Sequence, residues 1–223
     1  MNTIELLVLD MAGTTIDEDN VVYKTLMNAV NDYGYNVSLN EVLSSCAGKE
    51  KFDAIETLLE EINGKKEDAE AIFKDFSEKL KIAYQNLDVK PISGVENFLL
   101  KVRSAGKKVV LNTGYSSEIA QQLIKKLGWK ENVHFDALIT ADDVTASRPN
   151  PDMIFLAMKK FGIDDAKKVL KAGDSAIDIE EGRNAGCGMI IGVLSGAQNR
   201  NELEKAKPDY IFECISDAEN ILF

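Results

Sequence analysis

The sequence contains one histidine and three cysteines among its 223 residues, and both scarcities narrow the chemistry it can perform. With His134 alone, a Ser-His-Asp triad or a histidine-based metal site has little to be built from. His134 lies in a polar connection before an expected strand, where we expect a structural or solvent-exposed role. The cysteines are odd in number, far apart and outside any CxxC pair, at Cys46, Cys187 and Cys214. We therefore expect reduced thiols in a cytoplasmic protein rather than a disulfide framework or a zinc site.

Long hydrophobic runs and an excess of positive charge are also missing. The opening MNTIELLVLD has no basic region, and no later stretch is apolar for long enough to span a bilayer. We therefore expect neither a secretory signal nor a membrane partner. The net charge of −11 is spread along the chain, which argues against binding nucleic acid or anionic membrane by bulk electrostatics. An anionic ligand would need a site made locally positive by a metal ion and by individual lysine or arginine residues.

The sequence does contain a short apolar run that ends in an aspartate. Leu6 to Leu9 are continuously apolar, which is typical of a strand buried on both faces. Asp10 follows at once, and Gly13 then interrupts the regular structure. Ligands of open α/β sheets bind beyond the carboxyl ends of the strands, so Asp10 would be held rigidly and still face a substrate. The alternative interpretation is a strand that ends in a turn-forming aspartate.

Hydrophobic periodicity divides the chain into two kinds of structure. Apolar residues recur at helical spacing after the first strand without a strand candidate, whereas strands and helices alternate in the second part. Expected strands lie at 108–112, 137–140, 169–172, 189–193 and 210–212, and expected helices include 21–35, 41–47, 94–105, 116–127, 151–161 and 178–185. Such alternation implies a parallel sheet covered on both faces, which must include the first strand. We therefore predict an α/β fold with a Rossmann-like parallel-sheet core at 1–17 and 91–223, and a helical cap domain inserted at 18–90.

Polar residues of complementary types follow four of the expected strands. In chain order they are Asp10 and Ala12; Thr113, Gly114 and Tyr115; Arg148; and Asp174 with Asp178. These strand ends lie side by side in a parallel sheet, so the residues should converge on one crevice. Asp10 and Asp174 are hard oxygen ligands suited to Mg²⁺. Thr113 offers a hydroxyl, the turn after it offers backbone N–H groups, and Arg148 supplies a permanent cation, which together suit a phosphoryl group.

These motifs resemble those of the haloacid dehalogenase superfamily of aspartate-nucleophile hydrolases, with a helical cap inserted after the first strand. The likeness runs across nearly the whole chain. DMAGTTID, NTGYS, SRPNPDM and GDSAIDIEEGRNAG are most similar to the corresponding motifs of phosphonoacetaldehyde hydrolase (phosphonatase) and its relatives. The resemblance implies that Asp10 is the nucleophile that forms an aspartyl-phosphate.

The same resemblance implies roles for the other matching positions. Mg²⁺ would be bound by Asp10, the backbone carbonyl of Ala12 and Asp174, with Asp178 supporting these ligands. The resemblance further implies that Thr113 and Arg148 are catalytic residues that bind the phosphoryl group, and that Ala12, Gly114 and Tyr115 bind the substrate.

Ala12 distinguishes between members of this superfamily. Its phosphatases and phosphomutases carry a second aspartate here, which protonates the leaving alkoxide, and alanine cannot donate a proton. Phosphonatases break a P–C bond, and a lysine Schiff base lets the departing carbon leave as an enamine. Lys51, in AGKEKFDAI, falls where that lysine falls, at the start of an expected helix, where the helix dipole favours the neutral amine. The alternative is an ordinary surface lysine.

Two further positions bear on the substrate. Arg148 stands where many superfamily phosphatases have lysine, as it does in phosphonatases, whereas Ala54 stands where phosphonatases carry a proton-shuttling histidine. We predict a Mg²⁺-dependent, phosphonatase-like hydrolase that acts on phosphonoacetaldehyde or a related carbonyl phosphonate. The alternatives are a phosphatase for a small phosphate monoester such as phosphoglycolate, a metal-independent dehalogenase, against which Asp174 and Asp178 argue, and a non-catalytic phosphate sensor. The expected partner is a small phosphorylated or phosphonate substrate, and a homodimer stays open.

Overall fold

The computed structural model describes residues 4–47, 49 and 51–223, and the chain separates into two compact units. One unit consists of Met1–Asp17 and Val89–Phe223, and the other of Glu18–Asp88. The first contains a sheet covered by helices, and the second is helical.

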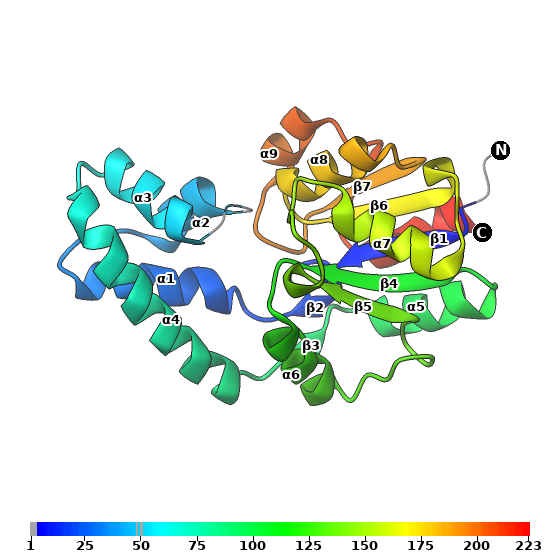
Figure 1. The fold of residues 1–223 in the computed structure, drawn as a ribbon, viewed down its shortest axis with the longest axis horizontal. Helices are drawn as coiled ribbons and strands as arrows, with labels where there is room; N and C mark the ends of the chain where they lie inside the picture. The colour runs from blue at the N-terminus through cyan, green and yellow to red at the C-terminus, as the bar shows by residue number, and fades with distance from the viewer. Residues whose placement is uncertain (1–3, 48, 50) are drawn as a thin grey trace. The chain divides into compact units, whose positions relative to one another are not determined.

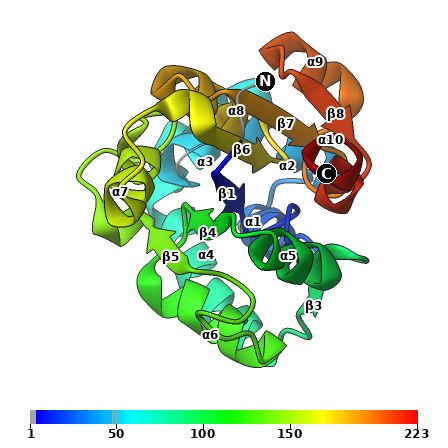
Figure 2. The ribbon, with the colours of Figure 1, turned by 90° about the vertical axis from the view of Figure 1, so that its right-hand side faces the viewer.

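Six strands of the described residues form a parallel sheet in the first unit, in the order β5-β4-β1-β6-β7-β8 (Figure 1, and Figure 2 for β8). They are β1 (Leu6–Asp10), β4 (Lys108–Thr113), β5 (Ala137–Thr140), β6 (Val169–Gly173), β7 (Met189–Val193) and β8 (Tyr210–Phe212). Every residue of β1 is buried, as its apolar run predicted. In register, Asp10 pairs with Asn112 of β4, and Leu9 pairs with Ala172 of β6. The predicted α/β fold with a Rossmann-like parallel core is confirmed.

Helices cover both faces of this sheet (Figure 2). One face is covered by α7 (Asp152–Phe161), α8 (Ala176–Ala185) and α9 (Arg200–Ala206), which share an apolar core with Leu6, Val8 and Val110. The other face is covered by α5 (Val95–Ser104) and α6 (Ser117–Leu127). The remaining short helices are η2 (Ala141–Asp143), η3 (Ala166–Lys168), η4 (Ile215–Ala218) and α10 (Glu219–Leu222).

The second unit contains α1 (Val21–Asp32), α2 (Leu39–Cys46), α3 (Lys51–Glu61), η1 (Lys66–Asp68) and α4 (Ala69–Asn86). Here α1 packs against α4, and α3 packs against α2 and α4. Their amphipathic faces bury Leu26, Val42, Ile55, Leu59 and Ile72. Within the part of the chain that the structure describes, no helix has the length and apolar character needed to cross a membrane.

Several predicted boundaries were wrong by two or three residues, mainly because of helix capping. The first helix ends at Asp32 rather than at 35, because Gly34 takes a φ of 101° that ends the helix. The second begins at Leu39 rather than at 41, because Ser38 and Glu41 form a capping box. The helix predicted at 178–185 begins at Ala176. Sequence patterns did not predict α9 or the antiparallel pair β2 (Ile16–Asp17) and β3 (Lys90–Pro91).

The single histidine and the three cysteines have surroundings that suit structural roles. His134 stacks on Trp129 with ring centres 5.9 Å apart, and its Nδ1 accepts the backbone N–H of Lys130 at 3.1 Å. Cys46, Cys187 and Cys214 are all free thiols. Burial raises the pKa of Cys46 to about 11 and that of Cys187 to about 12, so neither thiol is an activated nucleophile.

Candidate active site

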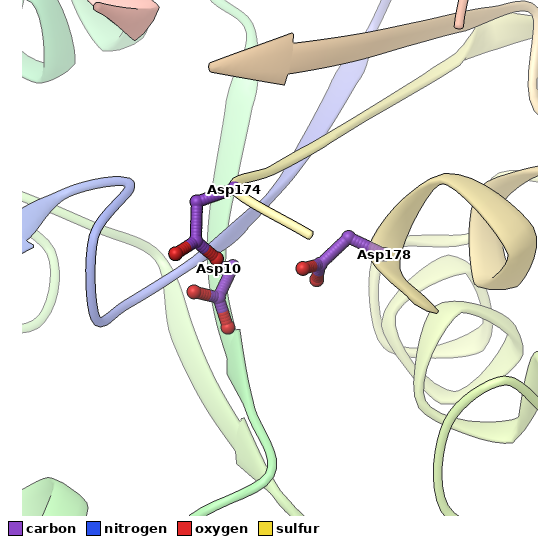
Figure 3. Close-up of side chains that lie close together, drawn as sticks. All are labelled: Asp10, Asp174 and Asp178. Carbon is purple, nitrogen blue, oxygen red and sulfur yellow. The ribbon is translucent and has the colours of Figure 1, made fainter. Parts of the chain in front are cut away.

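Three buried aspartates converge beyond the carboxyl ends of β1 and β6 (Figure 3). Asp10 is the last residue of β1, Asp174 directly follows β6, and Asp178 lies in the first turn of α8. One carboxylate oxygen from each lies within 4.8 Å of the others. Figure 3 shows the carboxylate of Asp178 directed from its helix toward the other two. Three buried carboxylates at this spacing could hold a metal ion.

Arg148 reaches two of these carboxylates, those of Asp10 and Asp178, from the loop that follows β5 and η2. Its Nη1 lies 2.7 Å from Oδ1 of Asp10 and 2.9 Å from Oδ1 of Asp178. Its Nη2 donates to the carbonyl oxygen of Asn112 at 2.6 Å and also to the side-chain oxygen of Asn112, and its Nε lies 3.1 Å from Glu181. Burial disfavours the guanidinium charge, but Asp178, Asp10 and Glu181 outweigh it and raise the pKa of Arg148 above its usual value. Arg148 is therefore a fixed cation beside Asp10.

Burial and mutual repulsion set the protonation of the three aspartates. Desolvation, and then repulsion from Asp10 and Asp178, raises the pKa of Asp174 to about 8. Desolvation also raises the pKa of Asp10 to about 6, against the opposing effect of Arg148. Desolvation acts on Asp178 as well, but Arg148 and Lys171 outweigh it and hold the pKa of that carboxyl below its usual range. A bound cation would favour the ionised form of each carboxyl.

Lys171 is a buried cation of this site that was not predicted from the sequence. It lies on β6 with no exposed surface, and its Nζ is 2.8 Å from Oδ1 of Asn112. The same Nζ is 3.0 Å from Oδ1 of Asp178 and 3.0 Å from Oε2 of Glu181. The signal in the sequence was a lysine inside the predicted strand VLKA at 169–172, because a buried ammonium requires acidic partners. Asn112 and Glu181 were missed with it.

The charges that this cluster buries fit a divalent cation. The carboxylates are those of Asp10, Asp174, Asp178 and Glu181, and the cations are Arg148 and Lys171. When all are ionised, two negative charges are left without a partner, and uncompensated buried charge is strongly unfavourable. Carboxylate oxygens are the ligands that Mg²⁺ prefers. The donor set therefore fits Mg²⁺.

The turn after β1 lies directly against Asp174. Thr15 donates its hydroxyl to the backbone carbonyl of Asp10 at 3.0 Å, which fixes the turn to the end of the strand. Gly13 has a φ of 72°, and a Cβ there would collide with the carboxylate of Asp174, so only glycine fits. Ala12 is half-buried in this turn, two residues after Asp10. Its carbonyl as a metal ligand stays a prediction.

A second turn, between β4 and α6, contains the residues predicted to bind a phosphoryl group. Thr113 is buried at the end of β4, and its Oγ1 accepts the backbone N–H of Tyr115 at 3.1 Å. Gly114 is exposed, and the N–H of Ser117 donates to Oδ2 of Asp142 at 2.8 Å. Two of the N–H groups expected in a phosphate cradle are thus bonded within the protein. The substrate roles of Thr113, Gly114 and Tyr115 stay predictions.

A third loop, at 194–198, fixes Asp174 from the other side and was also missed. The backbone N–H of Ala197 donates to Oδ2 of Asp174 at 2.6 Å, and the Ser195 hydroxyl donates to the carbonyl of Gly13 at 2.7 Å. A Cβ at Gly196 would collide with the Asp174 carboxylate. The loop therefore holds Oδ2 of Asp174 in place.

Lys51 belongs to the helical unit, where it is the first residue of α3. Its Nζ donates to the carbonyl of Lys49 at 2.9 Å and lies 5.2 Å from the centre of the Tyr23 ring. Both are partners that suit an ammonium. Ala54, one turn further along α3, is fully buried and supplies no acid or base. The catalytic role of Lys51 stays a prediction.

The pKa values of the aspartates predict that the metal-free protein loses stability as the pH rises from about 5 to about 8. A carboxyl whose pKa is higher in the folded than in the unfolded state destabilises the fold once it must ionise. For Asp10 this loss occurs between pH 3.8 and about 6, and for Asp174 between 3.8 and about 8. The lowered pKa values of Asp178 and Asp136 act below pH 3.8, outside this range. Thermal melting in EDTA across this range measures the effect.

Added Mg²⁺ should raise the melting temperature more at pH 8 than at pH 5, because it binds the ionised carboxylates. Asp174→Asn should flatten the pH dependence of the metal-free protein, since it removes the group with the widest titration range. A metal-free melting temperature that stays constant or rises from pH 5 to pH 8 would contradict the charge balance described above.

Comparison with known proteins agrees with this geometry. Residues 7–192 match the family model of haloacid dehalogenase-like hydrolases. A phosphonoacetaldehyde hydrolase of Bacillus cereus is 29% identical over 97% of this chain and 87% of its own length. A phosphonoacetaldehyde hydrolase-like protein from Oleispira antarctica has a similar solved structure, with a TM-score of 0.79, 22% identity, and coverage of 98% of this chain and 91% of that one.

A second solved structure, of a predicted phosphoglycolate phosphatase from Haemophilus somnus, has a TM-score of 0.81 and 20% identity, and covers 99% of this chain and 98% of that one. These structures share the fold of the chain. The family model covers most of the chain and includes all three converging aspartates. As its motifs predicted, this chain belongs to the haloacid dehalogenase-like hydrolases.

Proposed function

We propose that this protein is a Mg²⁺-dependent phosphonatase that cleaves the P–C bond of phosphonoacetaldehyde or a related carbonyl phosphonate. The observation that carries the proposal is Ala12, which has no proton to donate and lies two residues after Asp10. Asp10 otherwise has the surroundings of a phosphoryl-accepting nucleophile, since it lies at a strand end beside Arg148. The similarity to the phosphonoacetaldehyde hydrolase of Bacillus cereus supports the same choice.

In this proposal the carboxylate of Asp10 attacks phosphorus and forms an aspartyl-phosphate. Arg148, 2.7 Å from Oδ1 of Asp10, orients the attacking carboxylate and faces the negative charge of the phosphoryl oxygens. Thr113 would hold the phosphoryl group through its hydroxyl. Mg²⁺, held by Asp10 and Asp174 with the Ala12 carbonyl, would neutralise charge on the phosphoryl oxygens. Ser175 keeps Asp178 in place by donating its hydroxyl to Oδ2 at 2.6 Å.

The departing carbon needs an electron sink, because a bare carbanion is a very poor leaving group. The neutral amine of Lys51 would condense with the substrate aldehyde to an imine and release water. When the P–C bond breaks, its electron pair moves into the imine, which is protonated on nitrogen, and forms a neutral enamine. Water then hydrolyses the aspartyl-phosphate to phosphate. Protonation of the enamine carbon and hydrolysis of the imine release the aldehyde and restore Lys51. We further propose that residues 18–90 act as the cap that brings Lys51 to the substrate.

A phosphatase for a small phosphate monoester is the second candidate, and Ala54 favours it. Condensation with an aldehyde requires proton transfers, and a fully buried alanine at this position provides none. In the phosphonatase proposal these transfers are assigned to water. A phosphatase would need no imine, but it would need water to protonate the leaving alkoxide in place of an acid at position 12.

Borohydride trapping tests the imine directly. Phosphonoacetaldehyde with Mg²⁺ and borohydride should inactivate the protein irreversibly, because reduction converts the imine to a stable secondary amine. Peptide mass spectrometry should find the added two-carbon group on Lys51. Phosphoglycolate, which has no aldehyde, is the matched control and should leave no adduct. Full activity after this treatment, together with Mg²⁺-dependent release of phosphate from phosphoglycolate, would establish the phosphatase instead.

A further inference from the structure

We propose that Lys171 and Glu181 are positioning residues that hold the guanidinium of Arg148 against Asp10. Both side chains have no exposed surface, so neither can touch a substrate. The inference goes beyond the proposed function, because it concerns how the nucleophile is oriented and applies equally to a phosphonate or a phosphate ester.

The three side chains that surround Nζ of Lys171 also contact the guanidinium of Arg148. Oδ1 of Asp178 is 3.0 Å from Nζ of Lys171 and 2.9 Å from Nη1 of Arg148. Oε2 of Glu181 is 3.0 Å from Nζ and 3.1 Å from Nε of Arg148. Oδ1 of Asn112 accepts from Nζ at 2.8 Å and also from Nη2. Each nitrogen of the guanidinium thus meets an acceptor that Lys171 also binds.

This sharing fixes the rotation of the guanidinium. The Lys171 ammonium donates to Oδ1 of Asn112 and lies 3.0 Å from Asp178 and from Glu181, so it attracts all three partners of the guanidinium. Glu181 is further fixed because Oε1 accepts from Nδ2 of Asn112 at 3.0 Å. With these three partners held by Lys171, the guanidinium keeps all three nitrogens close to them in one orientation, which places Nη1 2.7 Å from Asp10.

Stability alone is a weak reason for this arrangement. Two cations here share acceptors in a buried site, and buried ionic groups can often be replaced by apolar ones without loss of stability. A fixed orientation of the Arg148 guanidinium toward Asp10, in contrast, depends on every partner that Arg148 shares with Lys171. Phosphoryl transfer relies on orientation and preorganised charge, so this orientation should affect the chemical step.

The test uses Lys171→Met, Glu181→Gln and the double variant, in which the pair loses one positive and one negative charge together. Each single variant should lower both the melting temperature and kcat, with kcat falling about 100-fold, the scale of a small misplacement of a catalytic group. The double variant should recover most of the melting temperature but not kcat. The affinity for orthovanadate in the presence of Mg²⁺, a readout that needs no turnover, should weaken in all three variants.

Arg103→Met is the matched control. Arg103 pairs with buried Asp136 at 2.9 Å, and Asp136 precedes β5 at the opposite end of the strands. This variant should lower the melting temperature without changing kcat or orthovanadate affinity.

Recovery of kcat together with the melting temperature in the double variant would overturn the inference, as would unchanged orthovanadate affinity. If Lys171→Met does not fold, Glu181→Gln and the double variant decide the matter. A wild type inactive on phosphonoacetaldehyde but active on phosphoglycolate would contradict the proposed substrate alone.

Discussion

Asp10→Asn should abolish turnover while leaving the sheet and its helices intact. The carboxamide has the same shape as the carboxylate and can still accept from Nη1 of Arg148, but it is not a nucleophile toward phosphorus. We expect kcat to fall by roughly 10⁵-fold, the scale seen when a covalent nucleophile is removed. Steady-state release of phosphate in the presence of Mg²⁺ measures the loss. Mass spectrometry of acid-quenched protein should find the aspartyl-phosphate in the wild type alone.

Stability provides the control for this variant. Because desolvation raises the pKa of Asp10 to about 6, its ionised form destabilises the metal-free fold at pH 7. Asp10→Asn should therefore melt no lower than the wild type in EDTA, and should lose much of the stabilisation by Mg²⁺. Asp136→Asn, at a buried aspartate paired with Arg103, should show the opposite, with lower stability and normal kcat. Substantial turnover by Asp10→Asn would exclude the aspartyl-phosphate route.

The sequence predicted the site residues whose positions are set by the carboxyl ends of the strands. The apolar run before Asp10 and the strand before Asp174 were both recognisable. The rule that parallel strands end at one edge then brought the two carboxylates together. Asp178 followed from its spacing in the same motif, and it lies in the first turn of α8 although the helix was predicted to begin two residues later. Local pattern and one topological rule were enough for these three residues.

The network behind Arg148 depends on information that local patterns do not contain. This network consists of Lys171 on β6, Asn112 on β4 and Glu181 on α8. They meet because β4 and β6 are the two neighbours of β1 and because α8 covers one face of this part of the sheet. The strand order is set by crossovers, which hydrophobic periodicity does not specify. A lysine in a buried strand signals that acidic partners exist, but it does not identify them. The loop at 194–198 was missed for a similar reason, since its contact with Asp174 is tertiary.

The position of Lys51 in its helix and the contacts of its side chain favour different forms of the amine. The sequence places an amine in the first turn of a helix, and the structure confirms that α3 begins at Lys51. The helix position favours a neutral amine, whereas the Lys49 carbonyl and the Tyr23 ring are partners of an ammonium. Condensation with an aldehyde would therefore require Lys51 to leave these partners and lose a proton. Its chemistry is best determined by a substitution that keeps the charge.

Lys51→Arg should separate the two candidate functions. A guanidinium keeps the positive charge but stays protonated and cannot form an imine. If the protein is a phosphonatase, kcat with phosphonoacetaldehyde should fall by roughly 10⁴-fold or more, as when other covalent catalytic groups are removed. If Lys51 only attracts an anion, the variant should keep much of its kcat and show a raised KM for phosphoglycolate. Both constants should be measured with both substrates in the presence of Mg²⁺.

Lys49→Arg is the matched control, because it makes the same change two residues away while leaving the backbone carbonyl that accepts from Lys51. It should have wild-type constants with either substrate, so a loss confined to Lys51→Arg cannot come from altered charge or bulk in this stretch. Lys51→Arg should gain no mass on treatment with phosphonoacetaldehyde and borohydride, whereas Lys49→Arg, which keeps the Lys51 amine, should gain the same mass as the wild type. If Lys51→Arg cleaves phosphonoacetaldehyde at the wild-type rate, the Schiff base is wrong. An active Lys51→Arg variant that also hydrolyses phosphoglycolate would leave Asp10 as the nucleophile of a phosphatase.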